Sequence, residues 1–161
     1  MIRLIAAIDR ERGIAKRGVI PWHIPEDAAF FDSETKKFGG KVLSGGVTFR
    51  VGYGGHPLAG RQNYILTHDP QPIEGATVIH DIAQFLEKFE GDLWVAGGAA
   101  VFEEVMELGY ADELYLTHVD ASFGCDRFFP EYEGSFTQIE QSEPKEQNGF
   151  TYRYTKYRRS A

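Results

Sequence analysis

The sequence predicts an α/β fold in which a mostly parallel sheet ends in antiparallel strands at its C-terminal edge. Apolar segments of strand length alternate with segments of helical periodicity up to residue 119, which is typical of parallel strands joined by helical crossovers. Residues 136–157 contain only strand-like segments. A chain of 161 residues has the length of one domain, so residues 1–161 are interpreted as a single domain with one core.

The first predicted elements are a buried strand and a polar loop. Residues 4–8 are continuously apolar, which favours a strand covered on both faces. Residues 9–20 are polar and contain Gly13 and Gly18, so we expect them to form a loop.

A helix is predicted to begin at Pro25, because proline suits the first helical position. Glu26 and Asp27 then lie in its first turn, where acids are favoured by the helix dipole. We expect the last turn to contain Lys36 and Lys37 and the helix to end at the pair Gly39-Gly40.

The remaining elements follow the same alternation. Asp81 is expected to cap a helix whose apolar positions have a helical period, and residues 150–157 have the period-two pattern of a strand with one wet face. The other predicted strands are 41–43, 62–67, 77–79, 93–96, 113–119 and 136–141, and the other predicted helices are 47–50 and 99–108.

Composition excludes several classes of function. The chain has 17 basic and 24 acidic residues, a formal net charge of −7, which argues against nucleic-acid or membrane-surface binding. A single cysteine excludes an internal disulfide framework and a cysteine-based zinc site. No apolar run approaches the ~20 residues of a membrane span, and the N-terminus becomes charged too early for a signal peptide. We therefore expect a cytoplasmic protein that binds no metal.

Three junctions after predicted strands stand out. Segments SGGVTF at 44–49 and GGAAVF at 97–102 each place a glycine pair between a strand and a helix. A helix N-terminus offers free N–H groups to a phosphate, and glycine lets the backbone approach a ligand closely. Each junction alone is equally compatible with a tight turn, but two in one sheet favour a dinucleotide.

The third junction, PWHIPED at 21–27, places Asp27 in a helical first turn close to Trp22. The simple interpretation is that Asp27 only favours the helix dipole. If Asp27 faces inward instead, a desolvated carboxylate there would pair bidentately with an amidine-like ligand edge.

Taken in order, these segments resemble the dihydrofolate reductase family over essentially the full chain. Matching segments lie at 4–9, 21–27, 45–49, 57–66, 95–102 and 114–130, together with Thr35. The resemblance implies an eight-stranded sheet, mostly parallel with an antiparallel C-terminal strand, flanked by four helices. It implies hydride transfer from NADPH to C6 of 7,8-dihydrofolate, with protonation at N5, giving tetrahydrofolate for one-carbon metabolism in a monomeric enzyme.

The resemblance assigns catalytic roles to three residues. Asp27 matches the buried acid that accepts hydrogen bonds from the pterin 2-amino group and N3, and Trp22 and Thr117 match residues that hold waters near it. A strand threonine and a core tryptophan are the simpler interpretations of the last two.

Substrate-binding residues are implied in the same way. Phe31 is expected to stack on the pterin and benzoyl rings, Leu58 to pack on the benzoyl group, and Arg61 to clamp the α-carboxylate of the glutamate. The other expected substrate residues are Ile5, Ala6, Ala28, Thr35 and Ala96.

The resemblance also implies a nicotinamide dinucleotide site. Gly97 and Gly98 match a pair joined by a cis peptide bond, and the 9–24 segment is expected to close over the site with help from Asp126. The expected cofactor residues are Ala7, Ile14, Ala15, Ile20, Gly45, Gly46, Val47, Thr48, Leu66, Thr67, His68, Gly97, Gly98, Ala99, Ala100, Val101 and Phe102.

The chain departs from the family pattern where the 2′-phosphate of NADPH is held. Gly46 and Ala100 stand at positions that are often basic, and Thr67-His68 stands at the third customary position. Arg50 or Lys41 is close enough in sequence to contribute. We predict a weakened preference for NADPH over NADH, so that NADH is also used.

Two further departures concern the pterin side. Ala28 and Ala96 are smaller than the usual aliphatic residues, which predicts a wider pocket and weaker binding of diaminopyrimidine antifolates. The glycine-rich loop at 52–56 has about two extra residues, which leaves Val51 and Tyr53 as candidates for a substrate contact there.

Two alternatives stay open at this point. A reductase of riboflavin biosynthesis shares the fold but would not need the acid of PWHIPED or the arginine of PLAGR. A non-catalytic pterin- or nucleotide-binding protein would not need a desolvated acid beside a closing loop.

Overall fold

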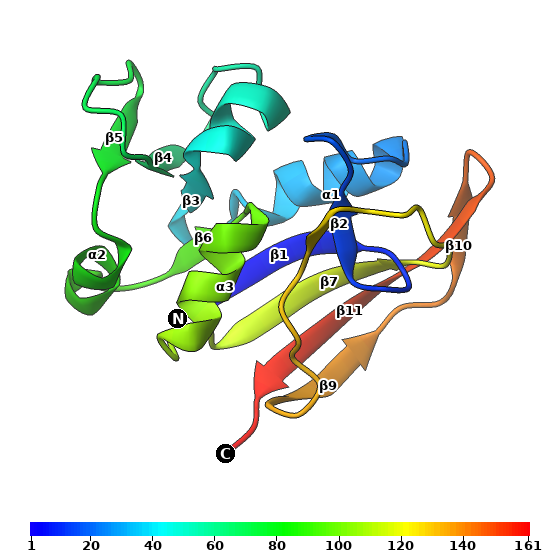
Figure 1. The fold of residues 1–161 in the computed structure, drawn as a ribbon. Helices are drawn as coiled ribbons and strands as arrows, with labels where there is room; N and C mark the ends of the chain where they lie inside the picture. Colours follow the sequence, from blue (N-terminus) through cyan, green and yellow to red (C-terminus); the bar gives the residue numbers. More distant parts are fainter.

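The structure, a computed structural model that describes residues 1–161, is built on one twisted sheet (Figure 1). Eight strands follow the order β10-β11-β7-β1-β6-β3-β4-β5, and β9 also pairs with β11. The strands from β7 to β5 in that order are parallel, and β11 is antiparallel to its neighbours β7, β9 and β10. The predicted fold class is therefore confirmed.

The elements have the following bounds. The strands are β1 Ile2–Ile8, β2 Gly13–Ala15, β3 Lys41–Gly45, β4 Gln62–Leu66, β5 Ala76–Ile79, β6 Leu93–Val95, β7 Glu113–Val119, β8 Arg127–Phe128, β9 Phe136–Gln141, β10 Lys145–Gln147 and β11 Phe150–Arg159. The helices are α1 Pro25–Glu34, α2 Ile82–Lys88, α3 Ala99–Glu107 and a wide turn of helix at Thr48–Gly52, with a 3₁₀ turn at Lys37–Gly39.

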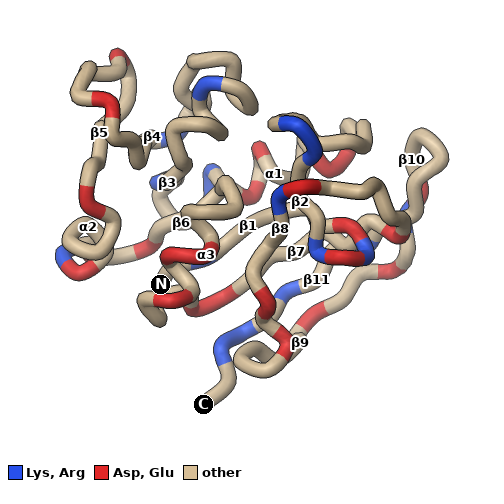
Figure 2. The backbone as a smooth tube through the Cα atoms, in the orientation of Figure 1, with Lys and Arg blue, Asp and Glu red and all other residues tan.

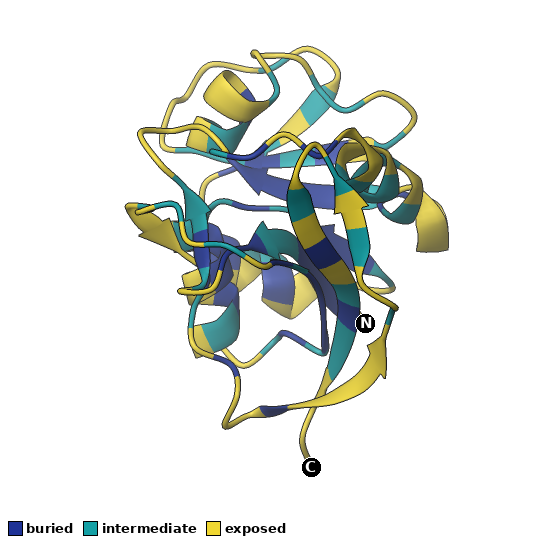
Figure 3. Ribbon diagram, turned by 90° about the vertical axis from the view of Figure 1, so that its right-hand side faces the viewer, coloured by how far each residue is buried: buried dark blue, intermediate teal, exposed yellow.

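Alternation along the strands divides the core into layers. Leu43 and Val95 belong to a large apolar cluster that also contains side chains of α2 and α3, whereas the neighbouring residues Val42 and Trp94 belong to a second cluster with Phe31 of α1. Side chains at successive strand positions point to opposite faces, so α1 covers one face and α2 and α3 cover the other. Figure 3 shows the resulting buried strands between more exposed outer elements.

Local signals explain most of the helix boundaries. Pro25 occupies the start of α1, with Glu26 and Asp27 in its first turn as expected. Asp81 caps α2 by accepting a hydrogen bond from the backbone N–H of Gln84 at 3.0 Å.

The predicted end of the first helix is wrong. Helix α1 ends at Glu34, and Lys36 and Lys37 lie outside it. The Thr35 hydroxyl bonds back to the carbonyl of Phe31 at 2.8 Å, and positive φ angles at Phe38, Gly39 and Gly40 then turn the chain into β3. The positive φ angles are the physical reason, because they are incompatible with continuation of a right-handed helix.

The predicted loop at 9–20 also needs correction, because it contains β2. This strand pairs with β8 of the distant segment 127–128 in a small antiparallel sheet. Strand β10 was not predicted either. Both strands are three residues long, too short to show a period. Separately, no helix has the length and apolar character needed to cross a membrane.

Candidate active site

The two glycine junctions meet at the carboxyl ends of neighbouring strands. Strands β3 and β6 are paired in parallel, and the N–H of Gly45 donates to the carbonyl of Gly97 at 2.7 Å. A side chain at Gly45 would lie 3.0 Å from Val101. A side chain at Gly45 would crowd Val101, so glycine lets the two turns lie close together. Ligands of open α/β sheets bind at this edge.

Asp27 faces the sheet from the first turn of α1. Its Oδ1 accepts a hydrogen bond from the Thr117 hydroxyl of β7 at 2.7 Å, and no cation lies within ion-pair distance of it. Burial raises the pKa of Asp27, and the hydrogen bond from Thr117 partly offsets that rise. The structure thus holds a desolvated carboxylate with unused acceptor capacity.

Aromatic residues surround this carboxylate. Trp22 is 7% exposed and packs on Phe123 with ring centroids 5.1 Å apart. Phe30 stacks on Tyr154 of β11 at 4.0 Å, and β11 places Tyr154 opposite Thr117.

Tyr154 is a site residue that the sequence analysis did not identify. Its hydroxyl is buried and makes no hydrogen bond within the chain. Burial, followed by the nearby charge of Asp27, raises the pKa of Tyr154 well above its ordinary value. The period-two pattern of β11 was visible in the sequence, but not which of its faces meets α1.

A second part of the site lies beyond Phe31. Phe31 and Leu58 pack with Ala96 against the cluster of Ile5 and Trp94. The buried Asn63 shapes this region, because its amide exchanges hydrogen bonds with the backbone of Leu58 at 2.9 and 3.0 Å.

Arg61 lies next to this apolar group, and only 4% of its side chain is exposed. Its guanidinium donates from Nη1 to the Thr35 hydroxyl at 2.8 Å, from Nε to the Ala59 carbonyl at 3.0 Å, and from Nη2 to Asp32 Oδ1 at 2.7 Å. The guanidinium that is predicted to clamp the α-carboxylate of the glutamate thus already bonds to residues of its own chain.

The second glycine junction offers uncapped backbone N–H groups to a ligand. Helix α3 begins at Ala99 with Gly98 as its N-cap, and no side chain caps its first N–H groups. A β-carbon at Gly98 would lie 3.1 Å from the Thr48 hydroxyl, so a larger residue would crowd this turn. The peptide bond between Gly97 and Gly98 is cis, as the resemblance implies. These features fit the phosphates of a dinucleotide.

A cation lies near the position that the family usually fills with a basic residue. A β-carbon at Gly46 would lie 3.0 Å from Nη1 of Arg50 and 3.2 Å from the hydroxyl of Thr67. Arg50 is exposed and appears in no ion pair. The guanidinium therefore occupies the space that Gly46 leaves open.

The 9–24 segment is fastened to the loop at 120–126. Asp126 donates its N–H to the carbonyl of Ala15 at 3.0 Å and accepts from the N–H of Arg17 at 3.1 Å. The Asp9 carboxylate is 3% exposed and accepts from the N–H groups of Gly13 at 2.7 Å and Phe123 at 3.3 Å. Both contacts support the expected pairing of the two segments.

Other expected residues reach the site to different extents. Ala6 is half-buried and packs against the core cluster on the α3 side. The side chains of Val101 and Phe102 are buried in the same cluster. Thr35 is fully buried beneath Arg61. Ala7, Ile14, Ala15, Thr48, Leu66, Thr67 and Ala99 are half-buried, whereas Ile20, Ala28, Val47, His68 and Ala100 are exposed.

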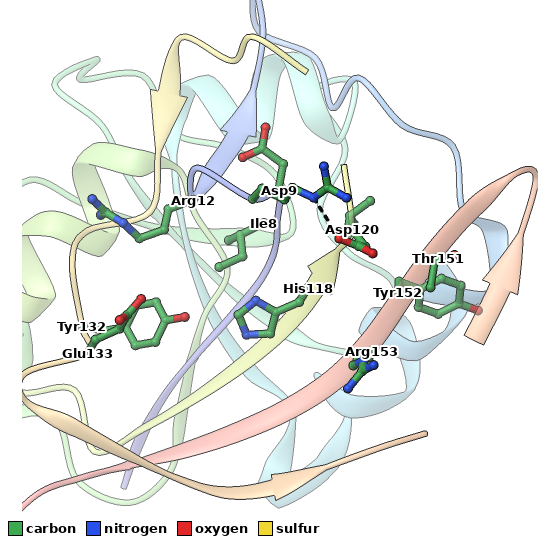
Figure 4. Close-up of a pocket in the computed structure, with 12 residues that line it drawn as sticks. Ile8, Asp9, Arg12, His118, Asp120, Tyr132, Glu133, Thr151, Tyr152 and Arg153 are labelled. Carbon is green, nitrogen blue, oxygen red and sulfur yellow. Dashed lines mark hydrogen bonds and ion pairs between the residues drawn. The ribbon is translucent and has the colours of Figure 1, made fainter. Parts of the chain in front are cut away.

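A separate cavity of about 360 Å³ lies near the start of the 9–24 segment (Figure 4). It is lined by Asp9, Arg12, His118, Glu133 and Arg153, among others. His118 follows Thr117 on β7, so its side chain points to the face of the sheet opposite Asp27. The cavity is therefore separate from the site at Asp27. Acidic and basic residues are scattered over the chain and do not gather into one basic surface (Figure 2). No group of three or more His, Cys, Asp or Glu side chains is arranged to hold a metal ion.

The fold and the site together define an α/β enzyme that binds a phosphate-bearing ligand beside a buried acid. The family profile described as dihydrofolate reductase matches residues 1–159. Dihydrofolate reductase of Bacillus subtilis (strain 168) is 34% identical over 163 residues, covering 98% of this chain and 94% of that protein. The enzyme of Aedes albopictus is 32% identical over 177 residues, covering 96% and 95%.

A solved structure is similar throughout. Dihydrofolate reductase from Enterococcus faecalis complexed with NADP(H) and RAB-propyl superposes with a TM-score of 0.85 at 31% identity, covering 100% of this chain and 97% of that one. The chain belongs to the dihydrofolate reductase family, whose known function is the NADPH-dependent reduction of dihydrofolate.

Proposed function

We propose that this chain reduces 7,8-dihydrofolate to 5,6,7,8-tetrahydrofolate with NADPH, acting as a single-domain monomer in the cytoplasm. The observation that carries the proposal is the Asp27 carboxylate, which is desolvated, lacks a cation and accepts one hydrogen bond, from Thr117. A carboxylate of this kind needs donors from a ligand, and the amidine-like edge of a pterin supplies two parallel ones.

The remaining site residues fit the rest of such a substrate. Phe31 and Leu58 provide an apolar face for the benzoyl group, and Arg61 provides a guanidinium for a carboxylate of the glutamate. Neither Asp27 nor Arg61 would be needed by a riboflavin-pathway reductase acting on a ribosylated pyrimidine.

NADPH, when bound at the glycine junctions, would supply the hydride that adds to C6. Asp27 holds the pterin by its 2-amino and N3 edge, and its negative charge raises the basicity of the ring, which favours protonation at N5. A carboxylate bound to the 2-amino and N3 edge would lie far from N5, so the proton would reach N5 through water. Trp22 is buried close to this helix start.

The test is NADPH oxidation by the purified protein, followed at 340 nm with and without dihydrofolate. We expect oxidation only when both are present. Oxidation that does not depend on dihydrofolate would remove this function. No oxidation at all would remove it as well and favour a non-catalytic binding protein.

We assign the 2′-phosphate of NADPH to Arg50, which fills the space beside Gly46 and Thr67. One exposed guanidinium, with neutral residues at Gly46 and Ala100, supports a weaker preference for NADPH than several hundredfold over NADH. Arg50→Ala is expected to lower kcat/KM roughly tenfold with NADPH and much less with NADH. Initial rates with both cofactors measure this, and an equal fall for both would contradict the assignment.

The small residues Ala28 and Ala96 support a further expectation, that diaminopyrimidine antifolates bind weakly. Ala96 is half-buried beside Phe31 and Leu58, so Ala96→Val is expected to fill part of the pocket and strengthen inhibition.

A further inference from the structure

The half-exposed Asp32 of α1 holds the guanidinium of Arg61. Asp32 Oδ1 is 2.7 Å from Arg61 Nη2, and Asp32 Oδ2 is 3.1 Å from the ammonium of Lys36. The hydrogen bond from Lys36, together with the charge of Arg61, lowers the pKa of Asp32 below its ordinary value. Asp32 is therefore ionised at neutral pH, and one carboxylate bridges two cations.

The surroundings of Arg61 leave little room for a second carboxylate. An arginine has five N–H donors, and Arg61 uses three of them within the chain, to Ala59, Thr35 and Asp32. The side chain is only 4% exposed, whereas Asp32 is 50% exposed. Asp32 is thus the one charged partner of Arg61, and its half-exposed side chain also pairs with Lys36.

We propose that Asp32 is a specificity-determining residue that competes with the carboxylate of the substrate for Arg61. This inference rests on the proposed function, in which Arg61 binds the glutamate of dihydrofolate. An incoming carboxylate must displace Asp32 or share the guanidinium with a like charge, and either costs binding free energy. The chain therefore discriminates less than its buried arginine suggests between pterins with and without an anionic tail.

The experiment compares KM for 7,8-dihydrofolate with KM for 6-methyl-7,8-dihydropterin, which has no carboxylate, at saturating NADPH. In Asp32→Asn, the amide no longer competes as an anion. We expect KM for dihydrofolate to fall roughly three- to tenfold while KM for the dihydropterin changes by less than about twofold. Higher salt should reduce the difference between variant and parent, because the competition is electrostatic.

Glu34→Gln is the matched control. It removes the same charge from the same helix, but Glu34 pairs with Lys37 at 3.0 Å and not with Arg61. KM for both substrates should stay at the parental value in this variant. A fall in KM for dihydrofolate equal to that in Asp32→Asn would show a general charge effect and overturn the inference.

Two other outcomes also overturn it. If KM for dihydrofolate rises in Asp32→Asn, Asp32 orients Arg61 instead of competing for it, and if KM is unchanged, Asp32 has no part in recognition. The failure of the proposed function is distinguishable, because the parent chain would then reduce neither substrate.

Discussion

The carboxylates of Glu113 and Asp27 lie near opposite ends of β7, and they have opposite kinds of partner. Glu113, the first residue of β7, is 4% exposed and lies 2.9 Å from Arg158 Nη2 and 3.4 Å from Arg3 Nε. Asp27 faces Thr117, four residues further along β7, and meets only a hydroxyl.

The difference in partners indicates that Glu113 stabilises the fold and that Asp27 is available to a ligand. A buried carboxylate that is paired on both oxygens has its interactions completed by the fold. A carboxylate left without a cation costs stability, and its pKa is raised by that burial. We infer that a ligand supplies the missing hydrogen bonds to Asp27. This places the site at the carboxyl ends of the strands, where ligands of open α/β sheets bind, and not at their amino ends.

The sharpest test of this contrast is Asp27→Asn. The amide can still accept the Thr117 hydrogen bond, so the fold should be retained, but it cannot pair as an anion with the pterin edge. We expect kcat/KM for dihydrofolate at pH 7 to fall at least about a hundredfold, or about 2.7 kcal/mol. Steady-state kinetics measures this, and parental activity in the folded variant would remove Asp27 from the mechanism.

The same acid-to-amide change at Glu113 should lower stability and leave activity nearly unchanged. Glu113→Gln removes the anion from Arg3 and Arg158, although Arg3 keeps Asp92 at 2.8 Å. We expect the free energy of unfolding to fall by about 2 kcal/mol with kcat/KM nearly unchanged. Urea unfolding and kinetics of the same preparation test both halves, and a large loss of kcat/KM in the folded variant would break the contrast.

Thr117→Val removes the hydroxyl that donates the one hydrogen bond to the Asp27 carboxylate. Loss of the hydroxyl removes the interaction that lowers the pKa of Asp27, so that pKa should rise further. We expect kcat/KM to fall roughly three- to tenfold at pH 7 and the pKa seen in its pH profile to move upwards. An unchanged pH profile would mean that Thr117 is only a strand residue.

The smallest expected effect is on stability as a function of pH. Because the pKa of Asp27 is raised in the folded state, its ionised form destabilises the fold above that pKa, and protonation relieves this as the pH falls towards 3.8. Asp27→Asn should therefore melt at a higher temperature than the parent at pH 7, and the difference should shrink near pH 4. A difference that grows on acidification would show that Asp27 stabilises the fold as an anion.

Local signals in the sequence were sufficient for much of the fold. The helix start at Pro25 and a strand over residues 4–8 were both predicted correctly, because a proline at a helix start and a continuous apolar run act over a few residues. Asp27 was predicted as a candidate in the same way, from its place in a first turn.

Contacts between segments that are distant in the sequence could not be predicted from local patterns. The pairing of β2 with β8 joins segments about 110 residues apart, and Tyr154 reaches the site only because β11 lies beside β7. The hydrogen bond from Arg61 to Asp32 joins residues 29 positions apart, and neither local sequence predicts it. Which face of a strand meets a helix, and which side chains share a guanidinium, depends on tertiary packing.

The contact between Gly13 and Cys125 gives the chain a built-in chemical reporter. A β-carbon at Gly13 would lie 2.5 Å from the Cβ of Cys125, and the thiol donates to Asp9 at 3.5 Å. Burial, reinforced by Asp9 and neighbouring acids, raises the pKa of Cys125 to about 11, so the thiol reacts slowly while the two segments stay together. Cys125 is the one cysteine of the chain, so alkylation needs no introduced label. Its alkylation rate would report how often the 9–24 segment separates from the 120–126 loop.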